Sequence, residues 1–77
     1  MNDIIAAIAE GKRLRVTIRG GQLGCSDAQD ACDQYGYLIL WKCGDQYRID
    51  APDGENIICV DDPLYIKSII ESASPLD

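Results

Sequence analysis

The chain has no histidine and no phenylalanine, and no G-x-S-x-G sequence occurs in it. Histidine is the side chain most often used as a general acid or base near neutral pH. Without it, a serine or cysteine nucleophile would need a lysine or carboxylate base, or a thiol with a lowered pKa. The G-x-S-x-G motif would have marked a serine hydrolase. We therefore expect no catalytic residues and no enzymatic activity.

No apolar run is long enough to suggest a membrane segment. Residues 4–9 are apolar, whereas a spanning helix needs about 20 such residues. Asp3 precedes this stretch and Glu10 follows it, although a secretory signal begins with basic residues. We expect no membrane contact and a cytoplasmic location.

The four cysteines are Cys25, Cys32, Cys43 and Cys59, and no two of them form a C-x-x-C pair. The usual zinc-ligand spacings are therefore absent. Free, buried thiols that pack as small apolar residues are the main expectation for a cytoplasmic chain. A disulfide between Cys25 and Cys32 or between Cys43 and Cys59, or four thiolates around one metal ion, are the alternatives.

Two further segments have the composition of a ligand loop without its spacing. The glycines of residues 20–24 follow a predicted strand, but they lack the G-x-G-x-x-G spacing and no lysine follows them. Residues 50–56 are rich in oxygen ligands, but Pro52 would occupy the third position of an EF-hand loop. Both segments are interpreted as turns, and we expect no cofactor and no metal.

The length of 77 residues, with 47% hydrophobic and 26% charged residues, predicts one small globular domain over residues 1–77. Asn2 can cap a helix over residues 3–10, which Gly11 ends. Leu14, Val16 and Ile18 then alternate with arginines, which predicts a half-buried strand.

Residues 20–34 are ambiguous between a helix and a long polar loop. Ser26 and Gln29 fit a capping box, which favours a short helix over residues 27–34. Three strands are expected to follow, at residues 37–43, 46–50 and 56–60. Asp62 and Pro63 then begin a final helix whose buried face is Ile66, Ile69, Ile70 and Ala73, and residues 74–77 form a frayed tail.

This order predicts an α+β fold, with a four-stranded antiparallel sheet made of one strand and a three-stranded meander. The terminal helices, and the short helix at 27–34 if it forms, cover the sheet. The alternative is a small Sm-like or SH3-like barrel entered through a helix, suggested by the element order alone. The small core also allows a homodimer, with residues 37–43 contributing to it.

Charge is distributed unevenly along the chain. Residues 1–20 hold four basic and two acidic groups, whereas residues 21–77 hold three basic and eleven acidic groups. Such a field repels nucleic acid and anionic membranes and attracts basic surfaces. Arg13, Arg15 and Arg19 could form a basic strip, but the net charge of −6 argues against direct nucleic-acid binding. We expect these arginines to solvate an edge strand or to pair with acids of the same molecule.

The acidic residues suggest a function, although many have local reasons to be in turns and helix starts. We expect a non-enzymatic, stoichiometric inhibitor that occupies a basic nucleic-acid-binding surface of a larger protein. In size and charge the chain resembles phage anti-CRISPR and anti-restriction inhibitors. A small adaptor or regulatory subunit that docks through an apolar patch or a sheet edge is the alternative. The expected partner-binding residues are Asp27, Asp30, Asp33, Asp45, Asp53, Glu55, Asp61 and Asp62, with Tyr35 and Tyr47 as aromatic anchors.

Overall fold

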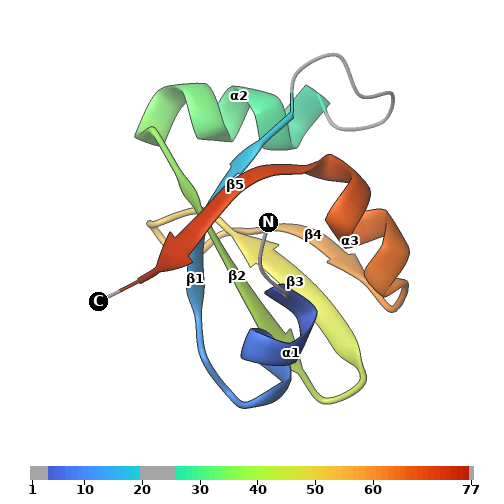
Figure 1. The fold of residues 1–77 in the computed structure, drawn as a ribbon. Helices are drawn as coiled ribbons and strands as arrows, with labels where there is room; N and C mark the ends of the chain where they lie inside the picture. Colours follow the sequence, from blue (N-terminus) through green and yellow to red (C-terminus); the bar gives the residue numbers. More distant parts are fainter. Residues whose placement is uncertain (1–3, 20–25, 77) are drawn as a thin grey trace.

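In the part of the chain that the structure describes, a five-stranded antiparallel sheet with three helices forms the fold (Figure 1). The computed structural model describes residues 4–19 and 26–76. The elements in chain order are α1 (Ile4–Ala9), β1 (Leu14–Ile18), α2 (Ser26–Tyr35), β2 (Leu38–Cys43), β3 (Gln46–Asp50), β4 (Asn56–Val60), α3 (Pro63–Ile69) and β5 (Ile70–Pro75).

The strands follow the order β4-β3-β2-β1-β5 across the sheet, and each neighbouring pair is antiparallel. The α+β class, the antiparallel sheet and the β2–β3–β4 meander confirm the prediction. The predicted count of four strands is wrong, because β5 adds a fifth. The barrel alternative is not confirmed: β4 and β5 are the outer strands of the sheet in the described part of the chain.

The fifth strand replaces the expected end of the last helix and part of the expected tail. Helix α3 ends at Ile69, and Ile70 is already extended, with φ −81° and ψ 126°. In Figure 1, β5 runs beside β1, where the register pairs Val16 with Ala73 and Arg15 with Ser74. Serine and proline are unfavourable in a helix interior. Pairing with β1 therefore stabilises residues 70–75 as a strand and not as a continuation of α3.

This pairing also places β1 inside the sheet, between β2 and β5. The expectation that its arginines solvate an edge strand is therefore wrong. The outer side of β1 is instead part of a continuous sheet surface, and the Thr17 and Ser72 hydroxyls on it lie 2.6 Å apart.

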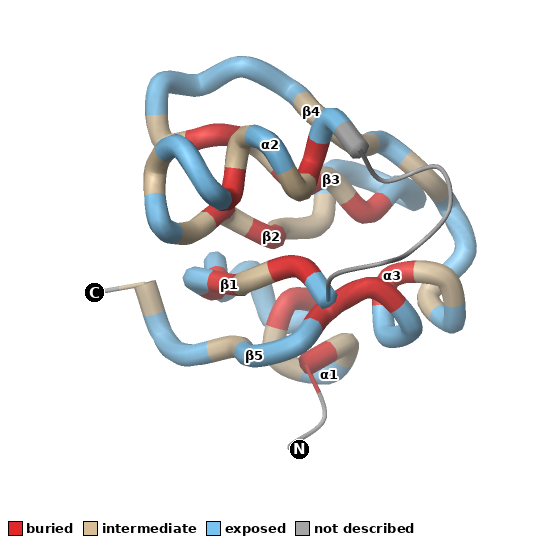
Figure 2. Tube along the Cα trace, turned by 90° about the horizontal axis from the view of Figure 1, so that it is seen from above, coloured by how far each residue is buried: buried red, intermediate tan, exposed pale blue. Residues whose placement is uncertain are grey.

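Alternation along the strands creates one core. Leu14, Val16 and Ile18 are buried, as predicted, and they belong to the same cluster as Leu40 and Ile49. All three helices contribute buried residues to this cluster, and Figure 2 shows these buried segments in the helices and central strands. The helix residues in the core are Ile4, Ile8, Ala28, Cys32, Ile66 and Ile69.

The predicted helix starts can be compared with the structure in part. At α3, the Asp62 side chain accepts a hydrogen bond from the Leu64 backbone N–H at 2.9 Å, and Pro63 occupies the first turn, as predicted. Helix α2 is present where the short helix was expected. The capping side chains of Asn2 and Ser26, and the turn at residues 20–24, lie outside the described structure.

The cysteines are only partly as expected. Cys32 is buried in the core, whereas Cys43 and Cys59 are exposed, and all three are free thiols. The alternative of a Cys43–Cys59 disulfide is wrong, since these residues lie on β2 and β4 with β3 between them. Cys25 lies outside the described residues.

Candidate functional site

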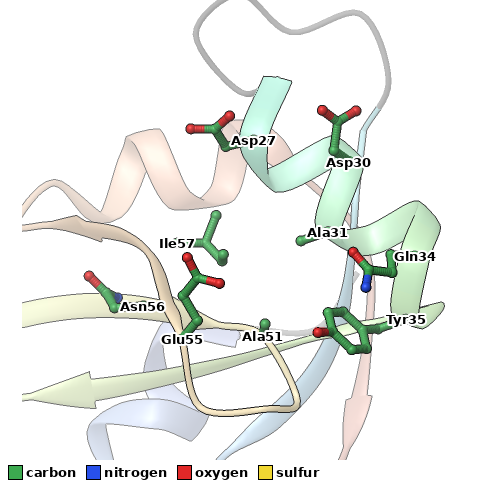
Figure 3. A pocket seen from close by; sticks show the side chains of 9 residues that line it. All are labelled: Asp27, Asp30, Ala31, Gln34, Tyr35, Ala51, Glu55, Asn56 and Ile57. Atoms are coloured by element: carbon green, nitrogen blue, oxygen red, sulfur yellow. The ribbon is translucent and has the colours of Figure 1, made fainter.

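An open groove of about 280 Å³ lies between α2 and the segment that joins β3 to β4. Figure 3 shows Asp27 and Asp30 on the helix and Glu55 on the opposite wall. Asp27 and Asp30 are three residues apart, so they share one side of α2. The remaining lining residues are Ala31, Gln34, Tyr35, Ala51, Asn56 and Ile57.

The groove therefore has carboxylates on its walls and apolar side chains between them. Ala31, Ala51 and Ile57 provide the apolar surface, and the ring of Tyr35 stands at one end (Figure 3). No lysine or arginine is among the described residues that line it. A cationic group that enters would meet negative charge from both walls.

A hydrogen bond between Tyr35 and Asp53 joins the two walls. The Tyr35 hydroxyl donates to Asp53 Oδ2 at 2.9 Å, and Asp53 Oδ1 accepts from the Glu55 backbone N–H at 2.9 Å. The tight turn also requires Gly54, whose φ of +99° is a conformation that other residues rarely adopt. These contacts fix the turn that carries Glu55 relative to α2.

The same contacts change two pKa values. The Glu55 backbone N–H, and then the Tyr35 hydroxyl, lower the pKa of Asp53 below its ordinary value. The hydrogen bond to Asp53 is the main cause that raises the pKa of the Tyr35 phenol. Asp53 is therefore ionised and Tyr35 is a neutral donor at neutral pH.

The carboxylates do not form a compact metal site. Within residues 4–19 and 26–76, no three cysteine, aspartate or glutamate side chains are grouped closely enough to hold a metal ion. Calcium needs six to eight oxygen ligands at about 2.3–2.6 Å. Separated carboxylates beside apolar surface fit an extended cationic side chain better.

The structure brings together some of the expected site residues and separates others. Asp27, Asp30, Tyr35 and Glu55 line the groove, and Asp53 contacts it through Tyr35. The others lie elsewhere. Asp33 is on α2, where it accepts a hydrogen bond from the Gln29 side chain. Asp45 lies in the β2–β3 turn, and Asp61 and Asp62 lie between β4 and α3.

Tyr47 is placed differently from the other expected anchor. Its side chain belongs to the core and only 8% of it is exposed, so it offers a partner little surface. Gln34 and Ile57, which are not among the expected site residues, also line the groove. No local pattern marks them, because α2 and β4 meet only in the folded chain.

Comparison with known proteins finds no matching family model, no matching curated protein and no matching solved structure. Among the described helices, none is long and apolar enough to cross a membrane.

Proposed function

We propose that the protein is a non-enzymatic binding protein whose acidic groove engages a basic surface of a larger protein. The observation that carries this proposal is the convergence of Asp27, Asp30 and Glu55 around one groove with no basic lining residue. These acids come from segments 25 to 28 residues apart in the sequence, so local turn and cap preferences do not explain why they line the same groove.

The groove suits a lysine or arginine side chain of the partner. Such side chains bury an aliphatic stem along apolar surface while the charged end stays among polar groups. Ala31 and Ile57 would contact the stem, and the carboxylates of Asp27 and Glu55 would accept hydrogen bonds from the head.

A protein surface that holds nucleic acid presents many such cations, because each bound phosphate is neutralised by lysine or arginine. The groove and the net charge of −6 would attract that kind of surface and compete with nucleic acid for it. We therefore propose a stoichiometric inhibitor of a nucleic-acid-binding protein, with the character of phage anti-CRISPR or anti-restriction inhibitors.

One observation favours the alternative, a small adaptor that docks through apolar surface. Leu64 in the first turn of α3 is 72% exposed, the only large apolar side chain in the described part of the chain that is so open. Binding through Leu64 would depend little on salt. Binding through the groove would weaken as salt rises.

Calorimetric titration with an arginine-rich peptide tests the proposal. We expect binding that weakens with added salt and is reduced at least tenfold in the double variant Asp27→Asn, Asp30→Asn. The control is the double variant Asp45→Asn, Asp61→Asn, which removes the same charge away from the groove. Equal losses in both variants would show that only net charge matters and would contradict the proposal.

A further inference from the structure

The outward side of the sheet has a different chemistry from the groove. The Arg13 guanidinium lies 4.5 Å from the centroid of the Trp41 ring, and that of Arg48 lies 5.2 Å from the same ring. Arg15 lies 4.6 Å from the ring centroid of Tyr37. We call these five residues the arginine–aromatic face.

Strand order explains how one ring contacts two arginines. Strand β2 lies between β1 and β3, and the register pairs Trp41 with Arg48 on β3. On the other side, Leu14 pairs with Leu40, so Arg13 is the residue next to Trp41. The indole thus lies between guanidinium groups from the two flanking strands.

Hydrogen bonds fix the orientation of this ring. Trp41 Nε1 donates to Asp50 Oδ2 at 2.7 Å, and the Asn56 side-chain amide donates to Asp50 Oδ1 at 2.9 Å. Asp50 therefore has partners for both oxygens. The indole is positioned before any ligand arrives, which lowers the entropy cost of binding.

Stacking occupies the flat side of a guanidinium and leaves its N–H groups at the edge free to donate. Arg13 is exposed, and its guanidinium group lies over the Trp41 ring. Arg48 forms an ion pair with Asp50, whose Oδ1 lies 3.8 Å from Arg48 Nε, and this Nε is shielded from solvent. The donors and positive charge that the face offers to an anionic ligand are therefore those of the exposed Arg13 and Arg15.

The net negative charge does not cancel this local positive charge. Charges on a protein surface are screened over about 8 Å at physiological ionic strength. The molecule measures 28 × 24 × 23 Å, which is about three such lengths. Asp50 is the acid that contacts this face, where it pairs with Arg48. Among the described residues, Arg13 and Arg15 form no ion pair, so their charge stays open to a ligand.

We propose that the arginine–aromatic face binds single-stranded nucleic acid, with Arg13 and Arg15 holding phosphates and unpaired bases stacking on the half-buried rings or on the guanidinium planes. Unpaired bases stack on aromatic side chains and on arginine. A duplex hides these base faces, and an acidic peptide would use the arginines but not the stacking surface. This site is separate from the acidic groove, and it revises the expectation that the protein does not contact nucleic acid directly.

Fluorescence anisotropy of a labelled oligothymidylate of about ten nucleotides tests this inference, since single-strand-binding domains cover about 4–16 nucleotides. Two arginine–phosphate contacts, from Arg13 and Arg15, predict a slope of about −1.4 for the logarithm of affinity against the logarithm of salt concentration. Trp41 is the only tryptophan of the chain, so quenching of its fluorescence reports contact at the face.

The variants Arg13→Gln and Trp41→Leu should each weaken binding at least fivefold. Lys67→Gln, which removes an exposed positive charge on α3, should leave binding unchanged. Thermal melting of each variant shows that it is folded. Absence of binding at low salt, an equal loss with Lys67→Gln, or equally effective competition by a polyglutamate peptide would overturn the inference.

Discussion

The Tyr35 hydroxyl donates a 2.9 Å hydrogen bond to Asp53 and so connects the last residue of α2 to the β3–β4 turn. Asp53 also receives the Glu55 backbone N–H. The Asp53 carboxylate thus fixes the position of the β3–β4 turn. Glu55, two residues further along the chain, forms a wall of the groove. The geometry of the groove depends on this pair of residues.

The first prediction concerns the pKa of Asp53. Tyr35→Phe removes the phenol donor, so the pKa of Asp53 should rise toward its ordinary value, though the Glu55 backbone N–H still holds it down. Carboxyl-carbon NMR titration measures this change. Tyr37→Phe is the matched control, and a similar rise of the Asp53 pKa there would contradict the assignment.

The same pair predicts how stability depends on pH. The folded-state pKa of Asp53 is lowered, so its contribution is present above about pH 4 and is lost as the pH falls through the folded-state value. The folded-state pKa of Tyr35 is raised, so its contribution is present below about pH 10 and is lost as the pH rises further. Urea unfolding of wild type and Tyr35→Phe should therefore differ most between these limits.

A second prediction compares two apolar residues of α3. Ile66 is 0% exposed and Leu64 is 72% exposed. Ile66→Ala should lower the free energy of unfolding by about 2–5 kcal/mol, because it leaves a cavity in the core. Leu64→Ala should change it by less than about 0.5 kcal/mol. Similar losses in urea unfolding of the two variants would be inconsistent with this packing.

The start of the same helix provides a third prediction. Asp62→Ala removes the side chain that accepts the Leu64 N–H, and this should cost about 1 kcal/mol of unfolding free energy. The neighbouring Asp61→Ala makes the same charge change outside the cap and should cost less than about 0.5 kcal/mol. Thermal melts of both variants check the difference.

A fourth prediction concerns thiol reactivity. Iodoacetamide should modify Cys43 and Cys59 rapidly in the native protein, because both are exposed. Cys32 should react only after unfolding, because it lies in the core. Peptide mass spectrometry locates the modified residues. Rapid native modification of Cys32 would show that α2 does not pack as described.

Most local elements and the β2–β3–β4 meander were predictable from sequence, whereas the pairing of β1 with β2 and β5 was not. Alternation at Leu14, Val16 and Ile18 identified β1, and Asp62 with Pro63 identified the start of α3. The spacing of Ile66, Ile69 and Ile70 fits a helix, yet Ile70 begins β5. That outcome depends on hydrogen bonds to β1, a strand more than 50 residues earlier in the chain.

The acidic residues of the site were predictable as a set, but their arrangement was not. No sequence pattern distinguishes Asp30 from Asp45 as a binding residue. In the fold, Asp30 lines the groove and Asp45 lies in the β2–β3 turn. The sequence likewise does not distinguish Tyr35 from Tyr47. In the fold, Tyr35 contacts Asp53, whereas Tyr47 is buried with Ile49 in the core. Strand register and the packing of α2 make these distinctions.

The most direct test of the acidic groove is an NMR chemical-shift map of the isotope-labelled protein during titration with the arginine-rich peptide. We predict that the shifts concentrate at Asp27, Asp30 and Glu55, with smaller changes at Asp45 and on the outward side of the sheet. Shifts of equal size at all exposed acids, or shifts centred on Leu64, would contradict the groove as the binding site.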